Sequence, residues 1–277
     1  MFVTRLLLIA AFLAAPAAMA QTAPAKAEEL VLEFDGGAYG VIPLGKASIR
    51  LRMDEAAYRA AGSIESGGLA ALFDRTLLSA QSSGAANGMA WRQFNLDHSY
   101  ARKRRVTFLE NGPSGVSGLI TPMFSNPGEP PPTAAQKAAA RDPLSTLAAM
   151  AAKVAATGAC DGVFPTFDGR FLYNLTLTRE GEGRMRAEGF DGPVLKCKMR
   201  YQPVAGYRAG TDIGRRIPQG EIWFGRIDGA RFAPPVKVSA PLPLGSAAIR
   251  LTRLKRAEVT VETAETPTEA MQTARTQ

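Results

Sequence analysis

The two cysteines constrain the fold of this chain more than any other residues. Cys160 follows a segment with helical periodicity, and Cys197 lies where apolar and basic residues alternate, as in a strand. The alternation places Cys197 on the side of Leu195 and Met199, which we expect to face the core. We therefore predict a disulfide between Cys160 and Cys197 that attaches a helix to a sheet. A redox pair or a metal site is less favoured, because the chain has no CxxC motif and a single histidine.

Residues 142–158 predict that helix. Asp142 suits the N-cap, Pro143 the first helical position and Gly158 the C-terminal end. Lys153 is the only charged residue between positions 145 and 160, so we expect the helix to lie against a sheet. It would be either a core helix or a movable plug over a groove of lipid size. Its apolar stripe consists of Leu144, Leu147, Ala148, Ala151 and Val154.

Residues 1–20 are expected to form a signal peptide. Arg5 precedes a short apolar stretch, and Ala18-Met19-Ala20 is a cleavage motif, so cleavage is expected after Ala20. No later segment is long and apolar enough to be a transmembrane helix. We therefore expect a periplasmic protein that begins with a flexible leader, residues 21–27.

The chain is basic, with a formal net charge of +8. In the periplasm, such a charge favours anionic envelope partners, such as lipopolysaccharide, phospholipid headgroups or wall polymers. Nucleic acid is not expected as a partner, because that compartment lacks it.

Alternating apolar and polar residues through most of the chain predict an antiparallel meander. Residues 67–84 fit either a helix or a strand, and we favour a strand. Turns are predicted at Asp168-Gly169, at 180–183 and at Asp191-Gly192. We expect one β-rich domain over 28–262 with an irregular, proline-rich connection at 126–141, followed by a disordered tail, 263–277.

Four consecutive basic residues stand at a predicted turn or strand entry: Arg102, Lys103, Arg104 and Arg105. They would either contact an anionic lipid or polymer, or protect an edge strand from aggregation; we favour the second role. His98, the single histidine, would have to serve any Ser-His-Asp or Cys-His catalytic system. We predict no catalytic residue, no metal and no cofactor.

A set of motifs in the central and C-terminal parts resembles domain-of-unknown-function family 3108, secreted proteins of Gram-negative bacteria. The resemblance implies a mainly β fold, in which a strongly curved antiparallel sheet, an open or spiral β-barrel, closes around the helix at about 142–158. It implies no activity. The matching residues are Asp142, Ser145, Cys160, Phe167-Asp168-Gly169-Arg170, Tyr173, Cys197, Pro203-Val204-Ala205-Gly206, Ile222-Trp223 and Leu244-Gly245.

Asp168 and Arg170 are the most distinctive part of this pattern. They would either meet a polar ligand at the mouth of the barrel or belong to a structural turn, which we favour. Trp223 is expected in the core rather than as a ligand platform.

Three functions remain open. The first is a non-enzymatic periplasmic protein that binds a lipid, lipoprotein or envelope polymer and so supports envelope integrity. The second is an interaction module whose basic surface, including Arg215 and Arg216, docks a partner. The third is a hydrolase of wall or glycan, which needs two carboxylates in one cleft.

Overall fold

This computed structural model describes residues 26–68, 71, 75–126, 128–208, 219–242 and 245–260. The strands among these residues form one antiparallel sheet of thirteen strands that is not closed. The predicted signal peptide, residues 21–25 of the predicted leader and the predicted tail lie outside the described residues.

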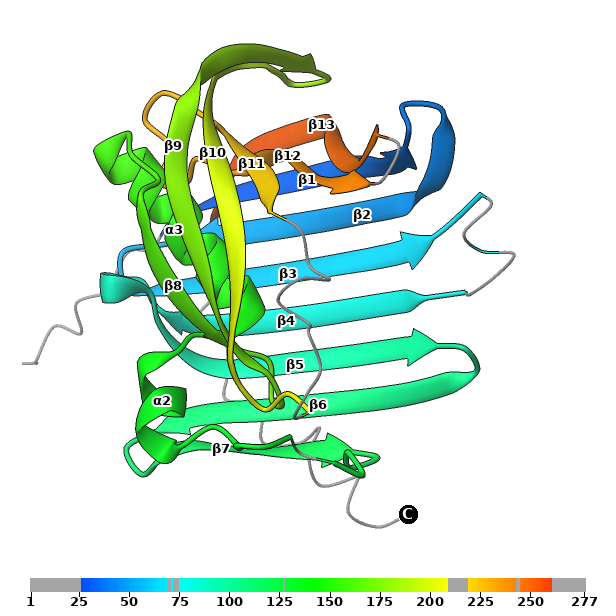
Figure 1. Ribbon diagram of the computed structural model, residues 1–277. Coiled ribbons are helices and arrows are strands. Elements are labelled where there is room, and N and C mark those ends of the chain that lie inside the picture. Colours follow the sequence, from blue (N-terminus) through cyan, green and yellow to red (C-terminus); the bar gives the residue numbers. More distant parts are fainter. Residues whose placement is uncertain are drawn as a thin grey trace, which may run out of the picture. The chain divides into compact units, whose positions relative to one another are not determined.

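The first half of the sheet is a meander in which each strand pairs with the next (Figure 1). Its strands are β1 (Lys26–Ala38), β2 (Ile42–Met53), β3 (Ala57–Ser66), β4 (Leu77–Ala85), β5 (Ala90–Tyr100), β6 (Lys103–Gly112) and β7 (Gly115–Thr121), with a short 3-10 helix, η1 (Asn87–Met89), before β5.

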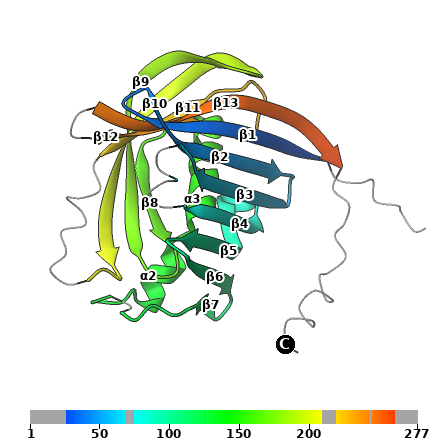
Figure 2. The ribbon, with the colours of Figure 1, turned by 90° about the vertical axis from the view of Figure 1, so that its right-hand side faces the viewer.

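The second half is a meander of six strands in the described chain, and its last strand pairs with β1. The first and last strands therefore lie side by side in the middle of the sheet, and β7 and β8 form its two edges (Figures 1 and 2). These strands are β8 (Gly162–Phe167), β9 (Leu172–Ala187), β10 (Phe190–Ala205), β11 (Gly220–Gly225), β12 (Pro235–Leu242) and β13 (Gly245–Thr260).

Two helices connect the edge strands, α2 (Ala134–Ala139) and α3 (Pro143–Thr157). The expectation of a wholly irregular connection at 126–141 was therefore wrong. Thr133 and Gln136 form a reciprocal capping box, with Thr133 N–H donating to Gln136 Oε1 at 2.9 Å, and this stabilises a helix of only six residues.

The long helix α3 begins and ends at the predicted residues. Asp142 Oδ1 accepts hydrogen bonds from the N–H groups of Leu144 and Ser145, both at 3.0 Å, and Gly158 adopts φ 67° at the C-terminus. The helix packs against β3, β4 and β8 and lies between the two halves of the sheet in Figure 1. Its buried apolar side chains include Ala148, Met150, Ala151 and Val154.

A buried hydrogen-bond network attaches the start of α3 to β3 and β4. The Tyr58 hydroxyl donates to Ser145 Oγ at 2.6 Å, and the Ser82 hydroxyl donates to Asp142 Oδ2 at 2.8 Å. Ser145 Oγ also donates to Asp142 Oδ2. Burial raises the pKa of Asp142, and these hydrogen bonds oppose that rise. The predicted Asp142 and Ser145 motif therefore fixes where the helix meets the sheet.

Tyr58→Phe is expected to alter the alkaline stability of the protein. Burial raises the pKa of Tyr58 from 10.0 to about 12, so the unfolded chain loses this proton first as pH rises. Its contribution to the free energy of unfolding is therefore complete only well below the unfolded pKa of 10.0, and it falls by about 1 kcal/mol between pH 9 and 11. Urea unfolding at pH 9 and at pH 11 should show that the free energy of unfolding falls by about 1 kcal/mol more in the wild type than in Tyr58→Phe. Equal losses in both proteins would contradict the prediction.

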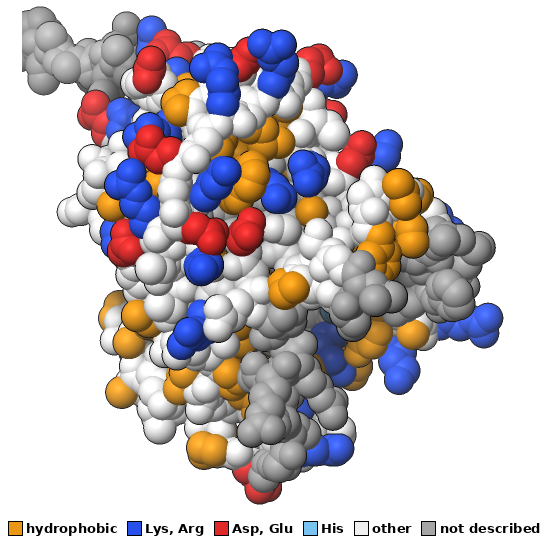
Figure 3. Space-filling view, turned by 45° about the horizontal axis from the view of Figure 1, so that its top comes forward, with side chains coloured by type: hydrophobic (Ala, Val, Ile, Leu, Met, Phe, Trp, Pro, Cys, Tyr) orange, Lys and Arg blue, Asp and Glu red, His pale blue; other side chains and the backbone are white. Residues whose placement is uncertain are grey.

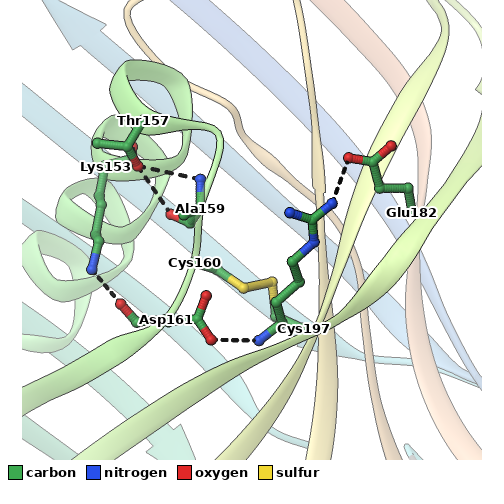
Figure 4. The surroundings of a disulfide bond; sticks show 8 residues. Lys153, Thr157, Ala159, Cys160, Asp161, Glu182 and Cys197 are labelled. Atoms are coloured by element: carbon green, nitrogen blue, oxygen red, sulfur yellow. Dashed lines mark hydrogen bonds and ion pairs between the residues drawn. A yellow bond between two sulfur atoms is a disulfide. The ribbon is translucent and has the colours of Figure 1, made fainter.

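The predicted disulfide joins the segment after α3 to β10 (Figure 4). Cys160 and Cys197 are 1% and 0% exposed and belong to one apolar cluster with Met150, Val154 and Phe224. The bond therefore fastens the helix to the second half of the sheet.

Replacing both cysteines by serine should lower the free energy of unfolding by about 4 kcal/mol. The bond spans 37 residues, and a loop of this length restricts the unfolded chain by about that amount. Urea unfolding measures the loss, and reduction of the wild type should reproduce it. The double variant should not respond to reductant, and a loss below about 1 kcal/mol would refute the bracing role.

Several strand boundaries differ from those predicted. β1 begins at Lys26, two residues inside the predicted leader, and Ala27 is buried. The predicted turn at 180–183 lies inside the continuous strand β9, and Asp191-Gly192 lies inside β10. The actual turn is at Glu188-Gly189, where Gly189 adopts φ 73°. The strand favoured for 67–84 is confirmed only for its second part, as β4 (Leu77–Ala85), whereas residue 71 is helical and residues 69–70 and 72–74 lie outside the described residues.

The sheet curls so that distant parts of it meet. The turn between β8 and β9 faces β6 and β7: a Cβ on Gly169 would lie 2.9 Å from Thr107 Cγ2 and 3.3 Å from Ile120 Cδ1. At the other side, Leu254 N–H of β13 donates to the Glu188 carbonyl at 2.8 Å. The site described next lies where the β8–β9 turn approaches the first half of the sheet.

Candidate functional site

Three adjoining cavities follow the face of the sheet on which α3 lies, and we call them together the trough. The turn cavity, beside the β8–β9 turn, has a volume of about 590 Å³. The middle cavity has about 190 Å³ and the far cavity about 330 Å³. Ile64 lines all three, and Leu78, Ala80 and Leu144 line both the turn and the middle cavity. The three cavities therefore adjoin one another, with Ile64 at their junction.

The trough has a mostly apolar lining. Ala47, Val238 and Ile249 line both the middle and the far cavity, and α3 contributes Leu144 and Leu147 to the middle cavity. These two leucines belong to the predicted apolar stripe, yet they are only half-buried. One side of α3 thus packs in the core, and another side forms part of the wall of the trough.

The turn cavity ends at Asp168-Gly169-Arg170. Asp168 Oδ1 accepts hydrogen bonds from the N–H groups of Arg170 at 2.9 Å and Phe171 at 2.7 Å, which fixes the turn. Burial raises the pKa of Asp168, and these hydrogen bonds oppose that rise. The structural role favoured from the sequence is therefore present, and both Asp168 and Arg170 also line the cavity.

The Arg170 guanidinium lies over two aromatic rings. Its Cζ atom is 4.6 Å from the centroid of Phe124 and 4.7 Å from that of Phe171. Arg170 Nε is buried and has no hydrogen-bond partner among the described residues. An unsatisfied buried group of this kind costs about 1–3 kcal/mol.

Arg105 approaches the same ring from β6. Its Cζ atom is 3.9 Å from the centroid of Phe124, Nε donates to the Pro122 carbonyl at 3.1 Å, and Nη1 donates to the Tyr100 hydroxyl at 3.4 Å. The sheet thus brings together two arginines that are distant in the sequence.

Tyrosines continue the lining from β9 towards β10. Tyr173 lines the turn cavity and stacks on Tyr201, with ring centroids 4.6 Å apart. The hydroxyls of Tyr201 and Tyr207 form a hydrogen bond. Burial raises the pKa of all three phenols, so they stay protonated and neutral at ordinary pH.

The basic run does not form one patch. Arg102 lies in the β5–β6 turn and Lys103 begins β6, both exposed. Arg104 forms an ion pair with Asp97 at 2.6 Å on the face of the sheet opposite Arg105. The ladder between β6 and β7 runs from Val106 to Gly112, so residues 102–105 lie beyond it and the favoured edge-strand role stays a prediction.

Trp223 is half-buried and packs against the apolar core without entering it, so the expected core position is met only in part. Its neighbours Ile222 and Phe224 are buried, so period-two alternation turns Trp223 to the other face of β11. Lys196 and Lys237 lie over its ring, with Nζ at 4.6 and 4.0 Å from the centroid. Burial and the charge of Arg250 lower the pKa of Lys237. Figure 3 shows Lys and Arg side chains gathered around hydrophobic ones in the upper part of the molecule, which includes β11.

The turn cavity contains few groups that suit catalysis. His98 lines it and lies beside Tyr100, with ring centroids 4.6 Å apart. Asp168 is the single carboxylate among the described residues that line this cavity. Within the described residues, no group of three His, Cys, Asp or Glu side chains could hold a metal ion, and no helix could cross a membrane.

Comparison with protein families identifies the chain. The family model described as "Protein of unknown function (DUF3108)" matches residues 34–252, from β1 to β13. This chain belongs to that family. The match confirms the resemblance found in the sequence and includes both cysteines and the whole trough.

A solved structure is similar to this chain in fold. It is described as "Crystal Structure of Beta-barrel-like Protein of Domain of Unknown Function DUF1849 from Brucella abortus", with a TM-score of 0.54 and 9% identity. The alignment covers 83% of this chain and 98% of that chain. At such an identity, the similarity shows the fold alone. A comparison with curated proteins gives no match.

Sequence reasoning found Asp168 and Arg170 but missed their partners Arg105 and Phe124 as a set. Alternation in β6 was the available sign, because Arg105 shares a face with the buried Thr107 and Leu109. Nothing in the sequence placed Phe124 beside Arg170, since it lies in the irregular segment after β7.

Gly169→Ala is expected to destabilise the protein and to disturb the turn. Gly169 has φ 102°, which L residues rarely adopt, and its new methyl group would meet Thr107 at 2.9 Å. Gly115→Ala is the matched control, because Gly115 has φ 101° with nothing within 4 Å. Urea unfolding should show that Gly169→Ala costs about 1–3 kcal/mol more than Gly115→Ala. Equal losses would mean that the turn does not pack on β6.

Proposed function

We propose that this protein binds the apolar chain of a lipid, or of a lipid-modified protein, in the trough and catalyses no reaction. The observation that carries the proposal is the run of three adjoining cavities with an apolar lining. A protein whose interior was filled with side chains would offer no such place.

The dimensions and the chemistry of the trough support this function. The turn cavity alone falls within the range of about 300–1,000 Å³ that is usual for small-molecule sites. Ile64 is 43% exposed although it lies at the centre of the trough. Covering such a surface with an acyl chain contributes about 25 cal/mol per Å² of apolar area removed from water.

In this proposal the sheet wraps around α3, and the helix is the inner wall of the binding site. Leu144 and Leu147 would contact the bound chain. The network at Asp142 and the disulfide at Cys160 hold the two ends of the helix, which favours a fixed wall over a movable plug.

The proposed location is the periplasm, with a role in envelope integrity. Two observations support it: the signal-like sequence at residues 1–20, and a disulfide, which persists in oxidising compartments.

The docking alternative has less support. It called for a flat basic patch, whereas Arg104 and Arg105 point to opposite faces, and Arg215 and Arg216 lie outside the described residues. A glycan hydrolase needs a second carboxylate near Asp168, and the described lining of the turn cavity supplies none.

Binding of the uncharged fluorescent probe N-phenyl-1-naphthylamine tests the proposal. The probe should bind the purified protein with enhanced emission, and Ile64→Asp should weaken binding at least tenfold by placing a charge among apolar walls. Native mass spectrometry of the purified protein should also reveal a co-purified lipid, as mass that disappears on denaturation.

Leu77→Asp is the matched control. Leu77 is 51% exposed on β4, next to Leu78 and on the opposite face of the sheet from the trough. This variant should bind the probe as wild type does. Absence of probe binding to wild type, or equal effects of the two substitutions, would overturn the proposed function.

A further inference from the structure

The turn cavity differs from the rest of the trough because it carries two cations at its end. Arg105 and Arg170 are the only arginines among the described residues that line the three cavities, and both line the turn cavity, whereas the far cavity has one lysine, Lys46. Both guanidinium groups lie over the ring of Phe124. Like charges that share one ring repel each other unless an anion compensates them.

Neither arginine has a carboxylate partner. No ion pair joins Arg105 or Arg170 to an acidic side chain in the described part of the protein, and Arg170 Nε has no hydrogen-bond partner there. Asp168 also lines the cavity, and the charge of Arg170 opposes the rise that burial causes in the pKa of its carboxyl group, but its Oδ1 atom already accepts two backbone hydrogen bonds. The cavity therefore holds two guanidinium groups and one carboxyl group among the described residues that line it, which leaves an excess of positive charge.

The position of these donors relative to the apolar walls defines the ligand. Four side chains that line the turn cavity continue into the middle cavity: Ile64, Leu78, Ala80 and Leu144. A molecule with its polar end at the arginines can thus extend its apolar part along the trough.

We propose that Arg105 and Arg170 form an anion subsite that binds the carboxylate or phosphate head of an amphiphile whose chain lies in the trough. This inference rests on the proposed function, and it adds the class of head group. The planar guanidinium donors match the paired oxygen atoms of both anions, and Phe124 holds the two side chains in place.

Competition with the bound probe tests the head group directly. The competitors share a twelve-carbon chain and differ at the head: dodecanoate, dodecyl phosphate, dodecan-1-ol and dodecyltrimethylammonium. Each is used below its critical micelle concentration, at low salt. The two anions should displace the probe at concentrations at least about tenfold lower than the alcohol, and the cation should be the weakest.

Substitutions then assign the preference to residues. Arg105→Gln and Arg170→Gln should each reduce the advantage of the anions over the alcohol by about tenfold and leave the alcohol unchanged. Arg104→Gln is the matched control, because Arg104 precedes Arg105 on β6 but pairs with Asp97 on the opposite face. It should keep the wild-type ranking.

The outcomes separate the two proposals. If all four competitors displace the probe equally, or the cation is strongest, the anion subsite is overturned and the trough stands. If the probe does not bind at all, the proposed function falls and the subsite with it. The ranking of the four competitors on the wild-type protein tests the subsite even if Arg170→Gln does not fold. The ratio of the concentrations at which dodecanoate and dodecyl phosphate displace the probe distinguishes a carboxylate head from a phosphate head.

Discussion

The pairing of β1 with β13 is the contact on which the rest of the sheet depends. It joins Lys26–Ala38 to the end of the described chain, Ala247–Thr260, and it is the contact that links two otherwise separate meanders. Leu30, Leu32 and Leu254 are buried along it. Without it, each meander would expose a long apolar edge. Contacts so distant in sequence form slowly, because the whole intervening chain must first be brought together.

The trough follows from this topology. With the first and last strands in the middle, the edges β7 and β8 are neighbours in sequence, and the segment between them must cross the sheet. That segment carries α3, whose N-terminus is bonded to β3 and β4 and whose C-terminus is tied to β10 by the disulfide. The same connection places the β8–β9 turn against β6 and β7. The site thus arises where opposite ends of one sheet meet.

Local sequence patterns predicted what depends on near neighbours. Asp142, Pro143 and Gly158 fixed α3, because caps act within one turn of helix. Alternation around Cys197 predicted its burial, and the helix and strand patterns together predicted the disulfide. The turn predicted at 180–183 was wrong, because cross-strand pairing with β10 outweighs the weak strand preference of Gly181 and Gly183.

The site itself depended on contacts that no local pattern contains. Arg170 was found as part of a family motif, whereas its neighbour Arg105 is 65 positions earlier in the chain. Their proximity results from the curl of the sheet, and the order of strands in a sheet is not encoded in periodicity. Trp223 was expected in the core but is only half-buried at its margin, because its buried neighbours Ile222 and Phe224 occupy the opposite face of β11.

The ion pair between Arg104 and Asp97 has a consequence for the accuracy of folding. In the observed register, Ser99 lies opposite Arg104 and His98 opposite Arg105. A slip of one residue would exchange the faces of β6, turning Arg104 into the trough and Arg105 outward. An exposed pair adds little stability, but Arg104 can reach Asp97 only when β5 and β6 are correctly aligned. The outer pair is therefore a marker of the one register that places Arg105 in the trough, rather than a contact that holds it there.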